Sequence, residues 1–181
     1  MTTKQPDYSS LILKEIILKE QLDQLEESLD LLREITGNSE IDLILDQPKK
    51  SPAQKVRFLE KVIEQLSSVE LQSVLKKIAT KEDFAFFEQV HLSLFIANLK
   101  QRLPEFASIA LSVAVHLTPE DLHEMAETVA EKVGQPVVLD LTVDPELVGG
   151  ARIHYGKFRR DNTLKSELDH LRGRRIPLTT F

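Results

Sequence analysis

The residue patterns that could carry catalysis or bind a metal are few in this chain of 181 residues. The segment His123–Glu127 has the first half of the H-E-x-x-H pattern, in which two histidines one helical turn apart bind zinc. Glu127 occupies the position where the second histidine is required, and Glu124 falls on the solvent side of the expected helix. We therefore expect no metal site in this segment.

Other chemistry-bearing residues are also explained without catalysis. The neighbouring carboxylates Glu26-Glu27 and Glu82-Asp83 lie on polar faces of expected helices, where solvation accounts for them. His91 falls on an apolar helix face with no second histidine within a turn, so we interpret it as a core or groove histidine. There is no cysteine, and the six glycines form no phosphate loop or dinucleotide-binding pattern. We expect no catalytic site, metal or cofactor. A small hydrolase, with a catalytic triad formed by residues distant in the sequence, is one of three hypotheses for the function.

Charge is distributed unevenly along the chain. The net charge is −6, and residues 151–181 hold eight Lys or Arg against three acids, so the first 150 residues carry −11. A basic end on an acidic body indicates a partner that is acidic at that end. Nucleic acid is one such partner, but Tyr155 and Phe158 are too few for the aromatics that usually accompany its recognition. We favour an acidic protein segment, with Arg172, Arg174 and Arg175 as the residues that would bind it.

Composition indicates a chain with a core of its own. Hydrophobic residues make up 41% of the sequence and are mostly aliphatic, while 29% of residues are charged. No apolar run approaches the ~20 residues that span a bilayer, and residues 1–7 lack the apolar stretch of a signal peptide. We expect no direct membrane insertion, and the absence of cysteine fits a reducing compartment.

The first elements that would position a site are amphipathic helices. Leucines at spacings of three, four and seven predict helix from Tyr8 to Ile35, either as one helix or as two that meet near Lys19–Leu22. Residues 39–46 predict a short helix. Three capped helix starts follow, at Ser51-Pro52 with Gln54, at Ser67 with Glu70, and at Thr80 with Asp83. The last of these helices would present one apolar face, formed by Phe84, Phe87, Val90, His91, Leu94 and Phe95.

After Pro104 the hydrophobic period changes from helical to alternating. Residues 109–117 and 137–143 alternate as strands, and a helix that starts at Thr118-Pro119 and ends at Gly134 lies between them. A third strand is predicted at 151–155, its extension through Arg160 is left open, and a last helix carries Leu164, Leu168 and Leu171. The fold class is therefore α+β: a five- or six-helix bundle over residues 1–105, then a small β-α-β-β-α domain over residues 106–181.

The stretch from Val143 to Gly156 is the most specific motif in the sequence. Pro145 ends one extended run, Gly149-Gly150 offers two adjacent positions at which positive φ costs little, and a strand ending in Gly156 follows. Together with the residues that begin the last helix, this stretch resembles the C-terminal signature of the delta subunit of F-type ATP synthases. The mitochondrial oligomycin-sensitivity-conferring protein belongs to the same family. The matching residues are Asp144, Pro145, Gly149, Gly150, Gly156, Asp161, Thr163 and Leu168.

The resemblance extends from Tyr8 to about Leu171, with some departures. Tyr8 stands where the family often has a tyrosine before its first helix, but Ser9-Ser10 replaces small apolar residues. Asn162 replaces a glycine, and Arg159-Arg160 occupies positions that are usually apolar. These departures put the fourth strand and the detailed N-terminal docking surface in question. We expect Gly149 and Gly150 to have a structural role only, which is to let two strands meet.

The resemblance implies a non-catalytic subunit of the peripheral stalk, or stator, of a rotary proton- or sodium-translocating ATP synthase. In that family the N-terminal bundle binds N-terminal segments of the alpha subunits, and the C-terminal domain binds the b-subunit stalk. We expect Tyr8, Leu11 and Ile12, with the helix at 69–79, to line the alpha-binding groove. The family also implies a peripheral position on the cytoplasmic face of a bacterial-type membrane, one copy per hetero-oligomeric complex, and no nucleic acid. A nucleic-acid-binding or transcription-associated protein with a basic C-terminal domain is the alternative.

Overall fold

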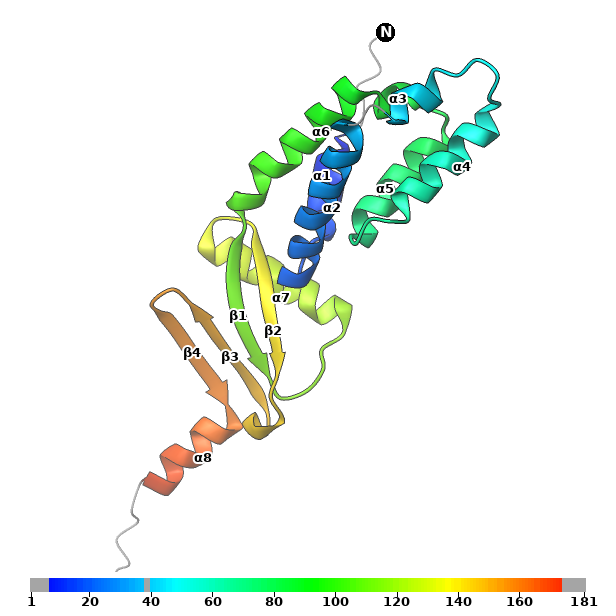
Figure 1. Ribbon diagram of the computed structural model, residues 1–181. Coiled ribbons are helices and arrows are strands. Elements are labelled where there is room, and N and C mark those ends of the chain that lie inside the picture. Colours follow the sequence, from blue (N-terminus) through cyan, green and yellow to red (C-terminus); the bar gives the residue numbers. More distant parts are fainter. Residues whose placement is uncertain (1–6, 38–39, 174–181) are drawn as a thin grey trace, which may run out of the picture. The chain divides into compact units, whose positions relative to one another are not determined.

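The computed structural model describes residues 7–37 and 40–173, which fall into two compact units divided between Phe106 and Ala107 (Figure 1). The N-terminal unit is helical and the C-terminal unit is built on a four-stranded sheet. This confirms the predicted fold class, a helical bundle followed by a small β-α-β-β-α region.

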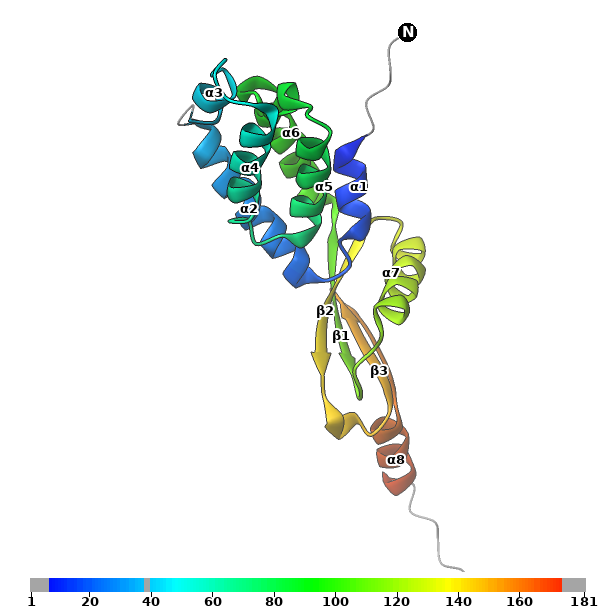
Figure 2. The ribbon, with the colours of Figure 1, turned by 90° about the vertical axis from the view of Figure 1, so that its right-hand side faces the viewer.

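The N-terminal unit consists of amphipathic helices packed around aliphatic side chains. Helix α2 packs along α6, α4 along α5, and α1 against both α5 and α6 (Figure 2). The core includes Ile12, Leu25, Leu29, Leu71, Leu75 and Leu92, each with no exposed surface. The elements are α1 (Tyr8–Glu15), α2 (Lys19–Gly37), α3 (Glu40–Leu45), α4 (Pro52–Ile63), α5 (Val69–Thr80), the 3-10 helix η1 (Phe84–Phe87), α6 (Gln89–Arg102) and the 3-10 helix η2 (Leu103–Glu105).

Two helices, not one, cover the region from Tyr8 onward. The break lies between Glu15 and Lys19, slightly earlier than the predicted meeting point. The side-chain oxygen of Gln21 accepts hydrogen bonds from the backbone amides of Ile17 and Leu18, at 3.0 and 2.9 Å. It therefore satisfies amides that the start of α2 leaves without helical partners.

Two of the three predicted helix starts need correction. The Ser51 capping box is present as predicted, but α5 is capped by Ser68, because the amides of Ser67 and Ser68 both donate to Ser28 Oγ on α2. The start predicted at Thr80 with Asp83 is wrong. Asp83 makes no capping hydrogen bond; the 3-10 helix η1 follows it, and α6 begins only at Gln89.

The later start changes which face of α6 is buried. Val90 and Leu94, predicted to be apolar core positions, are 67% and 64% exposed. His91 is also exposed, contrary to prediction, and its Nδ1 lies 2.8 Å from the carbonyl oxygen of Ala85. The 3-10 turn at Phe84–Phe87 interrupts the helical phase, so the stripe predicted across it does not continue. The buried side chains of α6 are Leu92, Phe95, Ile96 and Leu99.

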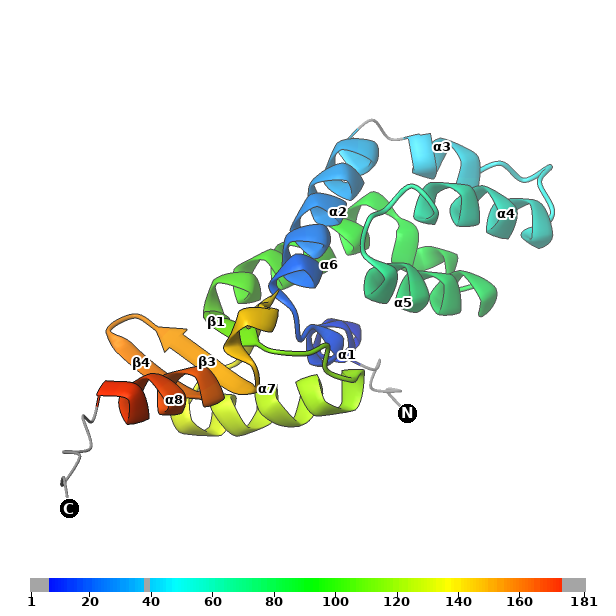
Figure 3. The ribbon, with the colours of Figure 1, turned by 90° about the horizontal axis from the view of Figure 1, so that it is seen from below.

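The C-terminal unit is a mixed sheet with strand order β2-β1-β3-β4. Strands β1 and β2 pair in parallel, and the other neighbours pair antiparallel. Helix α7 lies along one face of the sheet, against β2, while α8 contacts β4 and η3 (Figures 1 and 3). The elements are β1 (Ala107–Val113), α7 (Pro119–Val133), β2 (Val137–Val143), the 3-10 helix η3 (Pro145–Leu147), β3 (Gly150–Tyr155), β4 (Phe158–Thr163) and α8 (Leu164–Gly173).

Two strands differ from the sequence prediction, the first in its length and the fourth in being fully formed. The first strand ends at Val113, and Val115 is 64% exposed instead of continuing the alternation to residue 117. The fourth strand, which the sequence left open, forms along all of Phe158–Thr163 despite Arg159 and Arg160. An edge strand tolerates such charged residues because one of its sides faces no other strand.

The double-glycine turn differs in detail from the expectation of two adjacent positive φ angles. Positive φ occurs at Val148 and Gly150, at 64° and 81°, and not at Gly149. At Gly150 a Cβ atom would lie 2.0 Å from the carbonyl oxygen of Asn162 on β4. At Gly149 a Cβ atom would lie 2.8 Å from Leu164 Cδ1, so this glycine makes room for the first residue of α8.

The remaining motif residues shape the two ends of this turn. Asp144 accepts a hydrogen bond from the amide of Glu146 at 3.0 Å, and Pro145 opens the short helix η3. Gly156 has a φ of 55° in the turn between β3 and β4. Leu168 is 48% exposed on α8, so the motif supplies surface as well as core.

Asp161 and Thr163 form a hydrogen-bonded start for α8. The hydroxyl and amide of Thr163 donate to Asp161 Oδ1, at 2.6 and 3.2 Å, and Arg152 Nε donates to Asp161 Oδ2 at 2.8 Å. Thr163 Oγ1 in turn accepts a hydrogen bond from the amide of Ser166 at 3.2 Å, so Thr163 caps α8. These hydrogen bonds, with the Arg152 charge, hold the pKa of Asp161 below its usual 3.8.

Candidate functional site

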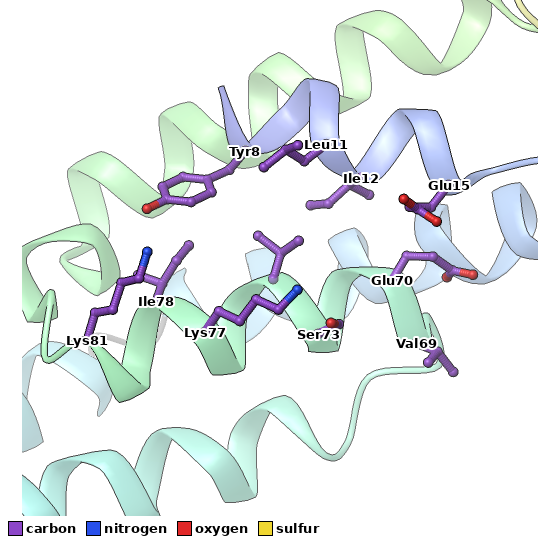
Figure 4. A pocket seen from close by; sticks show the side chains of 11 residues that line it. Tyr8, Leu11, Ile12, Glu15, Val69, Glu70, Ser73, Lys77, Ile78 and Lys81 are labelled. Carbon is purple, nitrogen blue, oxygen red and sulfur yellow. The ribbon is translucent and has the colours of Figure 1, made fainter. Parts of the chain in front are cut away.

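A groove of about 590 Å³ runs between α1 and α5 of the N-terminal unit (Figure 4). Its surface is mainly apolar, with four charged side chains along it. The two helices run in opposite directions, so Tyr8 lies near Lys81 at one end and Glu15 near Glu70 at the other. The lining residues are Tyr8, Leu11, Ile12, Glu15, Val69, Glu70, Ser73, Val74, Lys77, Ile78 and Lys81.

The residues predicted to line a partner groove are brought together here. Tyr8, Leu11 and Ile12 all come from α1, and they face the predicted second wall, which is α5. Leu11 is 49% exposed, whereas Ile12 is fully buried beneath it. Leu11 is thus the apolar side chain of α1 that the groove offers most fully to a partner.

The first residues of α1 are fixed by a polar cluster. Asp7 caps the helix by accepting a hydrogen bond from the amide of Ser10 at 3.1 Å. Arg102, from the end of α6, donates to Ser10 Oγ at 3.0 Å and lies 4.0 Å from Asp7. The hydrogen bonds from Ser10, and then the Arg102 charge, lower the pKa of Asp7. Ser10, a departure from the family pattern, therefore anchors α1.

Tyr8 is held by an aromatic cluster. Its ring meets Phe86 edge to face, with 5.7 Å between centroids, and Phe86 meets Phe95 at 5.1 Å. Such edge-to-face pairs are favourable because the positive edge of one ring meets the negative face of the other. The 3-10 helix that displaced the predicted start of α6 thus supplies the ring that supports one end of the groove.

The charged lining of the groove was missed by the sequence reasoning. The sequence did not single out Glu15, Lys77 or Lys81 as site residues. The signal that could have found them is their spacing: Ser73, Lys77 and Lys81 follow one another at four-residue intervals on α5. Their partner wall on α1 is about sixty residues away in sequence, so spacing alone does not reveal the groove.

The predicted basic docking residues are only partly described. Arg172 lies within the α8 backbone, but its side chain, and all of Arg174 and Arg175, fall outside the described residues. In the described part of α8, Lys165 Nζ lies 3.3 Å from a carboxylate oxygen of Glu146. The charge at this end is therefore partly offset within the unit.

Two further hollows occur on the C-terminal unit. One, of about 300 Å³, is polar and includes the ion pair between Arg152 and Asp161. The other, of about 500 Å³, lies between α7 and β3 and includes Met125, Val129 and Ile153. Both are open surfaces. The first also includes Ser166, Asp169 and His170, but among the described residues no hydrogen bond joins these three side chains.

The zinc-like segment has a simpler explanation. His123 Nε2 lies 3.3 Å from a carboxylate oxygen of Glu127, one turn along the exposed side of α7. Within residues 7–37 and 40–173, no group of three or more His, Cys, Asp or Glu is placed to hold a metal ion. No helix in that same part of the chain is long and apolar enough to cross a membrane.

In fold and site, this is a two-unit α+β protein whose helical bundle carries an open, mainly apolar groove. Comparison with known proteins makes the assignment specific. The chain belongs to the ATP synthase delta (OSCP) subunit family, whose model matches residues 13–174. It is therefore a structural subunit of the ATP synthase complex and not a catalytic one.

Several relatives match along most of their length. The ATP synthase subunit delta of Bacillus mycoides is 27% identical over 152 residues, covering 83% of each chain. That of Chlorobium chlorochromatii is 25% identical, covering 91% of this chain and 92% of the relative, and that of Clostridium perfringens is 24% identical, covering 84% and 87%. A chain of the Toxoplasma gondii mitochondrial ATP synthase hexamer covers 92% of this chain and 93% of its own, at 18% identity and a TM-score of 0.41.

Proposed function

We propose that this subunit acts in the peripheral stalk of a rotary proton- or sodium-translocating ATP synthase. The helical bundle would bind N-terminal segments of the alpha subunits of the catalytic head, and the C-terminal unit would bind the end of the b-subunit stalk. A link of this kind keeps the head from turning with the central shaft. Family membership supports the proposal, and the groove between α1 and α5 is the observation that carries it.

The groove has the chemistry of a helix-binding site. Its floor is aliphatic, and Leu11 and Val69 remain 49% and 68% exposed along it. An amphipathic partner helix would bury these side chains, at about 25 cal/mol for each Å² of apolar surface removed from water. The polar cluster at Asp7, Ser10 and Arg102 holds α1 in place before a partner arrives, which reduces the entropy lost on binding.

The C-terminal unit offers a different surface for the stalk. Leu164 and Leu168 are about half exposed on α8, and Arg172, Arg174 and Arg175 follow them in the sequence. Apolar contacts would supply most of the affinity, because exposed ion pairs contribute only ~0–1 kcal/mol each. The basic residues would steer and orient an acidic stalk helix, so binding of the b subunit should weaken as salt rises.

The proposed function implies a position in the cell, and it has one competing hypothesis. The protein would sit peripherally on the cytoplasmic face of the membrane, as one copy in a hetero-oligomeric complex. The alternative of a nucleic-acid-binding protein draws only on the basic C-terminal end. A gel-shift assay at two salt concentrations tests it, and specific retention of nucleic acid at the higher salt would favour it.

The groove is tested by charge insertion at its most exposed apolar residue on α1. Leu11→Asp should reduce binding of the isolated head at least about tenfold, because the carboxylate must be desolvated in an apolar contact. The matched control is Leu43→Asp on α3, where the leucine is 66% exposed and lies outside the groove. Binding is measured by pull-down of ATPase subunits with the full chain.

The two variants give different results if the groove binds the alpha subunits. Loss of head binding with Leu11→Asp, and retention with Leu43→Asp, supports the groove as the alpha-binding site. If head binding survives Leu11→Asp and disappears only after removal of the C-terminal residues, the division of partners proposed here is wrong.

A further inference from the structure

The charges along the groove are segregated by sign. Glu15 at the end of α1 and Glu70 at the start of α5 lie together at one end, and Lys77 and Lys81 lie toward the other (Figure 4). The apolar side chains of Leu11 and Ile12 lie between the two ends, and Ile78 lies at the lysine end. A partner that lies along the groove would therefore meet negative charge at one end and positive charge at the other.

Three of these four charges are free to meet a partner. Among the described residues, Glu15, Lys77 and Lys81 have no ion-pair partner, and all three side chains are exposed. Glu70 is different, because its carboxylate accepts hydrogen bonds from Gln21 at 2.6 Å and Ser68 at 2.9 Å. The Glu70 oxygens therefore already bind Gln21 at the start of α2 and Ser68 at the cap of α5.

We infer that the groove selects the direction of the helix it binds. The occupant is an amphipathic helix with acidic residues in its first turn and basic residues in its last turn. It lies with its N-terminus at Lys77 and Lys81 and its C-terminus at Glu15 and Glu70, parallel to α1 and antiparallel to α5. This inference rests on the proposed function of the groove and adds the polarity of the partner.

Charge complementarity with the groove favours this orientation, and the helix dipole favours this order of charges within the partner. Acidic first turns and basic last turns stabilise a helix through its own dipole, so this charge order is the one that favours helix formation by a short partner segment. In this orientation the same side chains also face groove residues of opposite charge. Reversal would place acid against Glu15 and base against Lys77, with like charges in contact.

The groove also sets the spacing of the partner's charges. Glu70 and Lys77 are two turns apart on α5, and Glu70 and Lys81 are about three, which is a span of roughly 10 to 16 Å. A partner helix running alongside would carry its acidic and basic residues about 7 to 11 positions apart, at the edges of its apolar stripe.

The experiment measures direction by cross-linking. The chain has no cysteine, so Thr80→Cys marks the lysine end of the groove and Lys14→Cys marks the glutamate end. The probe is a synthetic helix of about 18 residues with a Leu/Ile stripe, acidic first turn and basic last turn, and a single cysteine at either terminus. Disulfide formation with each full-chain variant is quantified at low and high salt.

The expected result is a strong pairing preference. The N-terminal probe cysteine should couple to Thr80→Cys at least about fivefold faster than to Lys14→Cys, and the C-terminal cysteine should show the opposite preference. The preference should shrink at high salt, where exposed charges are screened. Equal coupling at both positions, the opposite preference, or no coupling at either would overturn the inference.

Charge reversal supplies the second arm. Combining Glu15→Lys with Lys77→Glu and Lys81→Glu should invert the pairing, while Glu70 is left in place because of its structural hydrogen bonds. The control exchanges the charges of Lys76 and Glu64, an ion pair outside the groove, and should leave the pairing unchanged. Failure to invert refutes the polarity. Because Leu11→Asp reports separately on groove occupancy, failure of the direction and failure of the proposed function give different results.

Discussion

At Gly150 the backbone leaves little room for a side chain. Its φ is 81°, and the adjacent β4 strand approaches so closely that the carbonyl oxygen of Asn162 fills the Cβ position. Two constraints therefore act at once: a left-handed φ that side chains rarely adopt, and a steric contact with backbone that cannot rotate away.

Gly150→Ala should destabilise the C-terminal unit by more than about 2 kcal/mol, because both constraints are violated. Gly156→Ala is the matched control: its φ is 55°, but no atom lies within 4 Å of its Cβ position, so only the conformational cost of about 1 kcal/mol applies. Chemical denaturation of both variants measures the difference. Equal destabilisation would show that the contact with Asn162 is not limiting.

Asp161 makes the start of α8 sensitive to acid. Its pKa is lowered in the folded protein by the hydrogen bonds from Thr163 and Arg152 and by the Arg152 charge. A lowered pKa means that the stabilisation is complete above the unfolded value near 3.8 and is lost as pH falls through the lower folded value. Asp161→Asn should lower the Tm at pH 7, and it should lower the Tm less at an acidic pH below 3.8.

The control for this pH dependence is Asp169→Asn, an exposed residue on α8, the helix that follows Asp161. It should leave the Tm close to that of wild type at both pH values. A pH-independent loss of Tm with Asp161→Asn would assign the effect to hydrogen bonding by a neutral group and not to the ionised carboxylate.

At the scale of elements, the joint between α1 and α2 is connected to one wall of the groove through Gln21. Gln21 satisfies the amides of Ile17 and Leu18 and donates to Glu70 on α5. One side chain therefore caps the start of α2 and ties it to the opposite wall of the groove.

Gln21→Ala should cost about 1–3 kcal/mol of stability, because two backbone amides lose their acceptor. Hydrogen exchange in α1 should accelerate, and head binding should weaken with it. Gln24→Ala is the control, since Gln24 makes only an exposed 3.3 Å hydrogen bond to Glu20 within α2. Unchanged exchange in α1 of Gln21→Ala would show that the polar cluster at Asp7 holds this helix by itself.

The elements that the sequence predicted best are those set by near neighbours. The capping boxes at Ser51 and Thr118 form as predicted, because each involves residues three positions apart. The cap predicted at Ser67 moved to Ser68 because Ser28, far away in sequence, takes up both amides. The face of α6 was also mispredicted, since the 3-10 turn before it depends on aromatic packing with Tyr8 and Phe95.

At the scale of the whole molecule, two compact units correspond to the two proposed partners. We expect a fragment of residues 1–106 to keep binding an alpha-subunit N-terminal segment with an affinity within about threefold of the full chain, because the groove is made entirely within this unit. The same fragment should lose binding to the b subunit. Fluorescence anisotropy with labelled peptide and a b-subunit pull-down measure the two activities.

The complementary fragment, residues 107–181, provides the control. It should bind the b subunit in a salt-dependent way and show no affinity for the alpha segment. Retention of b-subunit binding by residues 1–106 would contradict the proposed division of partners.

The sequence by itself determined the family, the class of fold and most of the helix starts, because motifs, alternation and caps are read over a few neighbouring residues. It also identified Tyr8, Leu11 and Ile12 as one wall of a groove, through resemblance. Only the tertiary structure placed α1 against α5, exposed Val90 and Leu94, and gathered Glu15 and Lys81 at opposite ends of that groove. The physical reason is range: a cap depends on residues within one turn, whereas a groove depends on how two helices far apart in the chain pack together.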